Sequence, residues 1–599
     1  MGQRLVHSGP REWLILLGLF ALPWLLYGSV LGQFWTADDP PLLASLARHG
    51  IWAHFIDPRV WAWHLPEPPM WGVFTPWVML SMGLDWHLGG LDPRIAYLHH
   101  LLALGLTMVL LYLVLHRFFS RLAAGTACVL FMVTPPVQEA AHYLMERHYI
   151  EGLGLFLLGM LLYQRALHTA QGRSGGWPWA VASAVVYLAA CSAKEIYAPL
   201  AALLPLLPWG TWRQRWVLLL PHGVAAVLYM VWRVYMLSPD YVLGYGGGQV
   251  ELSLGQWLNV WHTGLILLNM EAPWQRGLLG VLAILLLCAM VRASVMAWLR
   301  ALALPLLTVL PLFPLLGMLQ IRLYFLPVLV LMIGCAFVLD WLLGLTMHWR
   351  NIRTDGTEAI PPGQLVAALV VCMAAPLLPR VIEPHESIQQ PMLARFEAEG
   401  RFALQANTHQ GLVHPISWPI DFWWYFTSLA AVRSSVLHDT QFPAVCYDPC
   451  FCSATAPRQG VHVMAGGLQQ ATLWPVSRDV AVCGNRSAPL TVHLAMDTSK
   501  VYPILRWRLG PYGADGYYAL HLEDTEHKVI GQYYPVRPIG QHPVGHGRIT
   551  VTIRWLSATG WSTVSPPFAI APGMSPIDWG RPQHAGIQKQ ASAIRPALP

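Results

Sequence analysis

Long apolar runs separated by short polar connections occupy roughly the first 380 residues of the chain. A run of about 20 apolar residues is long enough to cross the hydrocarbon core of a bilayer as a helix. The segment from Trp257 to Met270 is weaker and is compatible with a re-entrant or interfacial segment. The pattern predicts eleven membrane spans, at 12–32, 95–116, 122–140, 150–167, 177–193, 195–209, 216–236, 278–296, 301–317, 324–345 and 364–379.

The pattern changes after about residue 380, where polar residues become frequent. The segments 490–496, 527–536 and 547–570 alternate apolar and polar residues, which indicates β-strands with one buried face. A more helical stretch precedes them at 391–406. We therefore expect a multi-pass α-helical membrane protein with a C-terminal, mostly β domain, a sandwich. The predicted boundaries are 1–379 for the membrane domain, 380–581 for the β domain and 582–599 for a disordered end.

Composition and charge indicate how the chain is oriented in the membrane. Only 11% of the residues are charged, whereas a soluble globular chain carries about 25%. The formal net charge of +6 therefore indicates topology and not nucleic-acid binding. No small-x-small cleavage site follows the first apolar run, so we interpret it as an uncleaved span. Pairs of arginines mark the cytoplasmic loops: Arg4 and Arg11, Arg117 and Arg121, Arg165 and Arg173, Arg213 and Arg215, Arg292 and Arg300, Arg350 and Arg353. An odd number of spans then predicts a cytoplasmic N-terminus and an extracytoplasmic C-terminal domain, in the inner (cytoplasmic) membrane of the cell.

Two adjacent carboxylates, Asp38 and Asp39, follow the first predicted span. Acidic residues in such a position often bind a cation or take part in chemistry. The alternative is that they begin a helix, because an acid before Pro40, Pro41 and a leucine-rich run is a typical helix start. Apolar residues from Leu42 to Phe55 recur at near-helical spacing, which favours a helix lying in the membrane interface.

Several bases fall in predicted extracytoplasmic loops, against the usual charge distribution. Lys194 and Glu195 join two apolar runs, either as a local ion pair or with the ammonium facing a buried phosphate. Arg233 ends an apolar helix, where snorkelling to the interface is a sufficient explanation. The other misplaced bases are Arg147 and Arg322. Near the first of them, the spacing of three titratable residues fits one helical face and favours a polar site: Glu139, His142 and Glu146.

The nine cysteines fall into two groups. An even set lies in the exported tail, where disulfides with three alternative connectivities are expected; a metal site is the weaker interpretation, because no nearby histidine completes a usual ligand pattern. This set is Cys446, Cys450, Cys452 and Cys483. The others lie in or at spans, where we expect them to pack: Cys128, Cys191, Cys288, Cys335 and Cys372.

Five segments resemble motifs of integral-membrane GT-C glycosyltransferases that use polyprenyl-phosphate sugars. The resemblance is closer to the TMTC-type O-mannosyltransferase group and its bacterial relatives, and covers roughly residues 10–345. Each motif is weak alone, but the five occur in the right order and on the predicted outer face. They are ADDPPLL (37–43), LDWHLGGLDPRIAYLHHLL (84–102), PVQEAAHYLMERHYIEGLGLFLLGMLLY (136–163), SAKEIYAP (192–199) and QIRLYFLP (320–327). The repeat domain common in TMTC proteins is absent, and the β-like tail takes its place.

The resemblance implies transfer of a hexosyl or pentosyl unit from a polyprenyl-phosphate donor to a hydroxyl of a glycan, lipid or protein acceptor, outside the cytoplasm. It implies Asp39 or Asp38 as the general base. The phosphate-binding cations would be Lys194, Arg322, Arg147 and Arg233, and the substrate-binding residues would be Glu146, His142, Glu195 and Tyr324. The donor carries its own leaving group, a phosphate, so no nucleotide is needed; a divalent cation near the Asp pair fits the chemistry, although ligand spacing does not imply it.

Two alternative functions are compatible with a membrane protein of this kind. An O-antigen ligase or polymerase also acts on lipid-linked sugars outside the membrane, but usually carries its key groups in a large late loop. A polysaccharide or lipid transporter component would use intramembrane charges and show inverted repeats, and no repeat is evident in the sequence.

Overall fold

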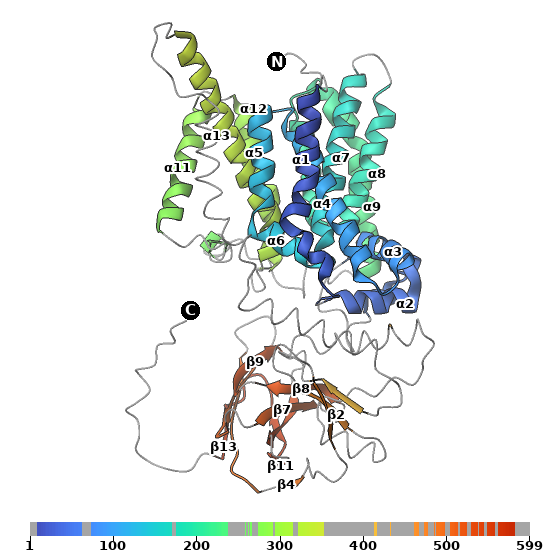
Figure 1. Ribbon diagram of the computed structural model, residues 1–599, viewed down its shortest axis with the longest axis vertical. Coiled ribbons are helices and arrows are strands. Elements are labelled where there is room, and N and C mark those ends of the chain that lie inside the picture. The colour runs from blue at the N-terminus through green and yellow to red at the C-terminus, as the bar shows by residue number, and fades with distance from the viewer. Residues whose placement is uncertain are drawn as a thin grey trace. The chain divides into compact units, whose positions relative to one another are not determined.

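The chain divides into two compact units in the computed structural model (Figure 1). The first comprises Met1–Gly400 and Ala431–Leu437, and the second comprises Arg401–Ala430 and His438–Pro599. The predicted domain boundaries at residues 379 and 581 stay predictions. The structure describes residues 9–36, 38–62, 74–170, 175–237, 258, 261–262, 264–265, 273–291, 294–315, 321–352, 412–415, 432, 461–465, 472–476, 484–485, 487–497, 504–512, 516–523, 529–536, 538–543, 548–557 and 561–580.

Helices build the first unit. Its α-helices are α1 (Pro10–Tyr27), α2 (Asp39–Ile56), α3 (Pro76–Gly89), α4 (Pro93–Leu115), α5 (Arg121–Met132), α6 (Pro135–His142), α7 (Arg147–Thr169), α8 (Trp177–Ala193), α9 (Trp212–Leu237), α11 (Pro273–Met290), α12 (Val295–Val309) and α13 (Phe325–Ile352). The 3-10 helices are η1 (Gly28–Gly32), η2 (Pro58–Ala62), η3 (Leu144–Glu146), η5 (Glu195–Leu206), η8 (Leu310–Leu315) and η9 (Ile321–Tyr324).

Six helical segments of the described residues are long and apolar enough to cross a membrane, which confirms the predicted multi-pass architecture. They are Pro10–Gly32, Pro93–Leu115, Leu144–Thr169, Trp212–Leu237, Val295–Leu312 and Ile321–Gly344. Shorter apolar helices cover Arg121–Met132, Trp177–Ala193, Glu195–Leu206 and Leu279–Met290.

The predicted spans agree with these helices in position more closely than in form. The span expected at 195–209 is not an α-helix but the 3-10 helix η5, with Pro199 and Pro205 inside it. Proline has no N–H to donate and disturbs a regular α-helix, which accounts for the difference. The span expected at 364–379 lies outside the described residues. The number of eleven therefore stays a prediction.

The predicted interfacial helix is present as α2. It begins at Asp39 and is interrupted at Gly50, whose φ of 71° suits a residue without a Cβ. Figure 1 shows α2 running across the direction of α1 and α4 at one end of the helices, with α3 beside it. Trp52 and Ile56, one turn apart on α2, are largely exposed. Both the direction of α2 and this apolar side agree with a helix in the membrane interface.

Strands build the second unit. A sheet of order β4-β11-β10-β7-β8, with β12 also paired to β10, accompanies a four-stranded sheet of order β13-β5-β6-β9 and a sheet of order β1-β2-β3. The bounds are β1 (Leu412–Pro415), β2 (Val461–Ala465), β3 (Thr472–Val476), β4 (Gly484–Asn485), β5 (Thr491–Asp497), β6 (Ile504–Gly510), β7 (Gly516–Glu523), β8 (Val529–Val536), β9 (Ile539–Pro543), β10 (Ile549–Ser557), β11 (Trp561–Val564), β12 (Phe568–Ile570) and β13 (Ile577–Trp579).

Two of these sheets share a core, as in the predicted sandwich. Alternate residues of β5 and β6, such as Leu494 and Trp507, pack with alternate residues of β7 and β10, such as Leu520 and Trp555. The antiparallel register pairs Leu494 with Trp507 and Trp555 with Tyr518. The three alternating segments of the sequence analysis correspond to β5, β8 and β10–β12, so these strand predictions are confirmed.

Several predictions fall outside the described residues, namely the helical stretch at 391–406, the end at 582–599, Cys372 and the cysteine set of the tail. The described cysteines are free thiols. Cys128, Cys191 and Cys335 are buried, as expected of packing residues, whereas Cys288 is exposed.

Candidate functional site

Asp39 connects the start of α2 to η3, which lies 106 residues later at Met145. Its Oδ2 accepts hydrogen bonds from Thr36, at 2.8 Å from the main-chain N and 3.1 Å from Oγ1. Its Oδ1 accepts one from the main-chain N of Met145 at 2.9 Å. Asp38 stands at the N-cap of α2 but makes no side-chain cap hydrogen bond. The helix begins where the sequence predicts, and the Asp39 carboxylate serves a contact beyond that helix.

Burial changes the acidity of Asp39. The residue is 0% exposed, and this burial raises its pKa from 3.8 to about 7, against the hydrogen bonds from Thr36 and the positive charge of Arg147. Half-buried Asp38 adds a smaller effect in the same direction as burial. A carboxylate with a pKa near neutrality is well matched to accepting a proton and releasing it again.

The segment after α5 does not form the single helical face that the spacing of its acids predicts. The helix α6 ends at His142, Tyr143 is extended with φ −112° and ψ 112°, and η3 follows. That prediction is wrong, because a break in the helix separates Glu139 from Glu146. Arg322 of η9 instead joins the two carboxylates. Its Nη1 lies 2.6 Å from Glu146 Oε1 and 3.9 Å from Glu139 Oε1.

His142 contributes local contacts at this break. Its Nδ1 is 2.8 Å from the carbonyl oxygen of Gln138, and its ring meets that of Tyr27 edge-on, with centroids 5.9 Å apart. The Tyr97 hydroxyl donates to the carbonyl oxygens of Phe34 and His142, each at 3.3 Å. Tyr97 therefore ties the first outer segment to α6.

The third contributing segment is the turn between α8 and η5. Lys194 is extended there, and its Nζ lies 3.5 Å from Glu195 Oε1 and 5.9 Å from the centroid of the Tyr149 ring. Arg233 of α9 approaches the same carboxylate, with Nη1 3.7 Å from Glu195 Oε2. Lys194 and Arg233 are both buried. The local ion pair expected at this turn is present, and it is extended by a second buried cation.

These segments come together at one end of the helices. The Glu146 carboxylate interacts electrostatically with Asp38, Lys194 and Arg322. His148 likewise interacts with both Lys194 and Arg322. We call the group the polar cluster: Asp38, Asp39, Glu139, Glu146, Lys194, Glu195, Arg233 and Arg322.

The polar cluster gathers three cations and the carboxylates that face them. Lys194 and Arg233 approach Glu195, and Arg322 approaches Glu139 and Glu146. Burial, followed by the nearby charge of Glu146, raises the pKa of Glu139, which favours the protonated form of this carboxyl. Ammonium and guanidinium groups gathered in this way suit a phosphate group.

Two residues predicted for the site have other surroundings. Arg147 is buried against α3, with Nη1 2.5 Å from Asp85 Oδ2 and 2.9 Å from Ser81 Oγ. Tyr324 is buried beneath Gly264, where a Cβ would lie only 2.6 Å from the tyrosine ring. The structure therefore does not place the Arg147 guanidinium among the contacts of Lys194 and Arg322.

Sequence reasoning missed Asp85 altogether, although it lies inside a quoted motif. An acid in the apolar helix α3 was the available signal. Among the described residues, no three His, Cys, Asp or Glu side chains gather in a way that could hold a metal ion.

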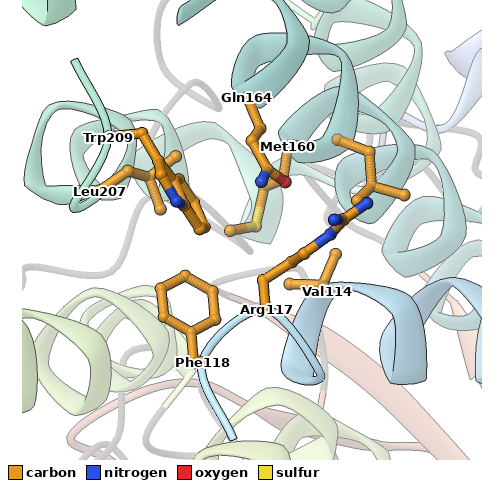
Figure 2. Close-up of a pocket in the computed structure, with 8 residues that line it drawn as sticks. Val114, Arg117, Phe118, Met160, Gln164, Leu207 and Trp209 are labelled. Atoms are coloured by element: carbon orange, nitrogen blue, oxygen red, sulfur yellow. The ribbon is translucent and has the colours of Figure 1, made fainter. Parts of the chain in front are cut away.

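A small pocket lies at the opposite end of the helices, lined by residues that include Val114, Arg117, Phe118 and Trp209. Figure 2 shows the rings of Phe118 and Trp209 at its edge, with Gln164 and Met160 across from them. The ring centroids of Phe118 and Trp209 are 5.1 Å apart. The pocket adjoins the arginine-rich loops, so it is separate from the polar cluster.

The chain is similar to several proteins of known structure. No protein-family model matches the chain, and no curated protein matches it. ArnT from Cupriavidus metallidurans bound to undecaprenyl phosphate is 14% identical with a TM-score of 0.42, over 76% of this chain and 94% of that one. The apo state of that ArnT is 16% identical with a TM-score of 0.43, over 76% of this chain and 93% of that one. A third likeness is the archaeal oligosaccharyltransferase AglB from Archaeoglobus fulgidus, in complex with an inhibitory peptide and a dolichol-phosphate. It is 12% identical with a TM-score of 0.40, over 70% of this chain and 64% of that one.

These likenesses are too distant to assign the chain to a family, since the identities are 16% or lower. Because their TM-scores lie below 0.5, the functional proposal depends on the contacts of the polar cluster and not on them.

Proposed function

We propose that the protein is a membrane glycosyltransferase that moves a monosaccharide from a polyprenyl-phosphate donor to an acceptor hydroxyl on the extracytoplasmic side. One observation carries the proposal. Asp39, a buried carboxylate with a pKa of about 7, belongs to the same polar cluster as the buried cations Lys194 and Arg233 and the partly buried Arg322. Transfer of a glycosyl group from a phosphate needs both a base and a cationic site for the leaving group.

The acceptor hydroxyl gives its proton to an aspartate as its oxygen bonds to the anomeric carbon. The bond from that carbon to the phosphate oxygen breaks, and the electron pair leaves with the phosphate. The donor phosphodiester carries one negative charge, and the departing phosphate gains a second. The cations of the polar cluster, Lys194, Arg233 and Arg322, are suited to stabilise that gain.

Asp39 and Asp38 are the two candidates for the base. Asp39 accepts three hydrogen bonds, and a carboxylate offers about four acceptor positions, so one position remains for an acceptor hydroxyl. Asp38 is half-buried beside it and interacts electrostatically with both Asp39 and Glu146. Separate variants distinguish the two.

Lys194 and Arg322 are the proposed phosphate ligands, with Arg233 supporting Lys194 through their shared partner Glu195. Glu146, His142 and Tyr324 are proposed to contact the sugar or the acceptor. Arg147 contacts α3 in the structure, which favours an indirect role for it.

The membrane orientation is part of the proposal. The polar cluster lies at the end of the helices opposite to Arg117, Arg121 and Arg215, which are typical of a cytoplasmic surface. We propose an inner-membrane location with a cytoplasmic N-terminus and an extracytoplasmic β unit.

The test is donor consumption by purified full-length protein in lipid nanodiscs. Labelled polyprenyl-phosphate hexoses and pentoses are supplied with glycan, lipid and peptide acceptors, and release of polyprenyl phosphate is measured. The wild type should consume one donor, and the Asp38→Asn and Asp39→Asn variants should separate the base from its neighbour. Full activity in both single variants and in the double variant would exclude an aspartate base.

Failure of the folded wild type to consume any donor in this panel would exclude the transferase. Consumption only of lipid-linked oligosaccharides would favour a ligase or polymerase. Movement of an intact lipid-linked sugar across the bilayer without bond cleavage would favour a transporter.

A further inference from the structure

A buried ion pair joins α3 to the start of α7. Asp85 is 4% exposed and Arg147 is 0% exposed, and Asp85 Oδ2 lies 2.5 Å from Arg147 Nη1. The other carboxylate oxygen of Asp85 lies 2.7 Å from Nδ1 of His99 on α4. Removing one partner from such a pair leaves an uncompensated buried charge, so the pair strongly fixes the two side chains.

The pair belongs to a polar seam between two helices. Arg147 Nη1 also donates to Ser81 Oγ at 2.9 Å, and the Ser81 hydroxyl donates to Glu151 Oε1 at 2.7 Å. Glu151 Oε2 accepts a hydrogen bond from Trp77 Nε1 at 2.7 Å. The residues of α3 follow one another at intervals of four, as do the two on α7, so each set lies on one helix face. Polar residues thus line the contact of α3 with α7 at this level.

The seam ends at the short segment that carries the contacts of the polar cluster. Arg147 Nε donates to the carbonyl oxygen of Leu144 at 3.1 Å. The next residue, Met145, donates its N–H to Asp39 Oδ1 at 2.9 Å. Glu146 follows, and its Oε1 lies 2.6 Å from Arg322 Nη1. A shift of Arg147 therefore moves the partner of the proposed base and the partner of a proposed phosphate ligand together.

Arg147 interacts with other carboxylates besides Asp85. The charges of Glu151 and, more weakly, Asp39 also act on its guanidinium. Its Nη2 is buried and has no hydrogen-bond partner among the described residues. The contact with Asp85 is its ion pair among the residues that the structure describes.

We propose that Asp85 is a positioning residue for the transfer reaction: it holds Arg147 against α3 and so fixes the segment Leu144–Glu146. The effect of Asp85 on the rate of transfer rests on the proposed function, whereas its effect on the segment Leu144–Glu146 does not. Asp85 touches neither donor nor acceptor, so it should govern the rate of transfer more than the binding of the donor.

The experiment compares Asp85→Asn, Asp85→Glu and a matched control in full-length protein. The control is Glu12→Gln, because Glu12 is 1% exposed and forms an ion pair at 2.9 Å with Arg121, which is 48% exposed, at the opposite end of the helices. Asp85→Asn should lower kcat by about tenfold or more with KM for the donor within about twofold of the wild type. Asp85→Glu should recover most of kcat, and Glu12→Gln should leave it unchanged.

Amide hydrogen exchange supplies a readout that does not need the transferase activity. Exchange over residues 143–149 should accelerate in Asp85→Asn and not in Glu12→Gln, because the Met145 N–H loses its fixed partner. A kcat within about twofold of the wild type, or unchanged exchange, would overturn the positioning role. An inactive wild type would instead refute the proposed function and leave the exchange result to decide the inference.

A second variant keeps the test valid if Asp85→Asn does not fold. In Asp85→Asn/Arg147→Gln both buried charges are absent, and removing a whole buried pair is often tolerated. This variant should fold, exchange faster over 143–149, and still lose kcat. Wild-type kcat in the folded double variant would refute the proposal.

Discussion

Replacing Asp39 by asparagine should abolish transfer and yet stabilise the protein at neutral pH. The side chain is fully buried, and its pKa rises from 3.8 to about 7 on folding. The folded state therefore binds the proton more tightly than the unfolded state, and stability falls as pH rises from about 4 to about 7. At pH 7 this linkage amounts to about 4 kcal/mol, and at pH 5 to about 2 kcal/mol.

Asparagine does not ionise, so the variant is free of this destabilisation, but it loses a hydrogen bond. Its oxygen can keep the two bonds from Thr36, but its amide then faces the N–H of Met145, donor against donor. A buried donor without an acceptor costs about 1–3 kcal/mol. The variant should thus be more stable than the wild type by about 1–3 kcal/mol at pH 7, and within about 1 kcal/mol of the wild type at pH 5.

Thermal unfolding of purified protein at the two pH values measures this difference, and donor consumption measures the activity. Asp38→Asn is the comparison, because Asp38 is half-buried and makes no cap hydrogen bond. If Asp39→Asn instead lowered the melting temperature equally at pH 7 and at pH 5, the Asp39 carboxylate would be stabilised in its ionised form. Its pKa would then not be raised on folding.

Three further predictions concern the polar cluster. The initial rate at saturating donor should rise with pH through about 7, because Asp39 accepts a proton only when ionised; a rate that is flat from pH 5.5 to 8 would contradict Asp39 as base. Lys194→Ala should lower the rate by about a hundredfold or more, measured by release of polyprenyl phosphate, and Lys194→Arg, which keeps the charge, should lose less; equal losses would show that charge is not what matters there. Arg322→Gln should destabilise the protein by up to about 3 kcal/mol in thermal unfolding, since Glu146 is 0% exposed and, without the guanidinium, is buried either as an unpaired charge or as a protonated carboxyl. The double variant Arg322→Gln/Glu146→Gln should recover most of that stability, and no recovery would argue against the ion pair.

The sequence predicts the helices and strands of this protein better than the tertiary contacts between them. Apolar runs and alternating segments locate the helices and the strands, and the start of α2 at Asp39 follows from the prolines after it. Spacing cannot show that Arg322 approaches Glu146, because 176 residues separate them. The motif resemblance assigned Arg322 to the phosphate and Glu146 to the substrate, and it did not predict that the two form an ion pair.

Two local errors have physical causes of the same kind. The acids Glu139 and Glu146 are spaced for one helical face, but the chain breaks at Tyr143, and a tertiary contact with Arg322 decides where both point. Arg147 was expected at the phosphate because it lies among outer loops. Its partner Asp85 is 62 residues earlier, in a helix whose sequence reads as apolar.

The ion pair between Glu146 and Arg322 also bears on how the protein is made. The ribosome adds roughly 5–20 residues each second, so the 176 residues between the two take roughly 10–35 s to synthesise. Until η9 emerges, the carboxylate of Glu146 has no guanidinium to neutralise it at the bilayer edge. We therefore expect nascent chains that stop before residue 322 to remain incompletely inserted and to be degraded. Stable insertion of the earlier helices would thus depend on synthesis of η9.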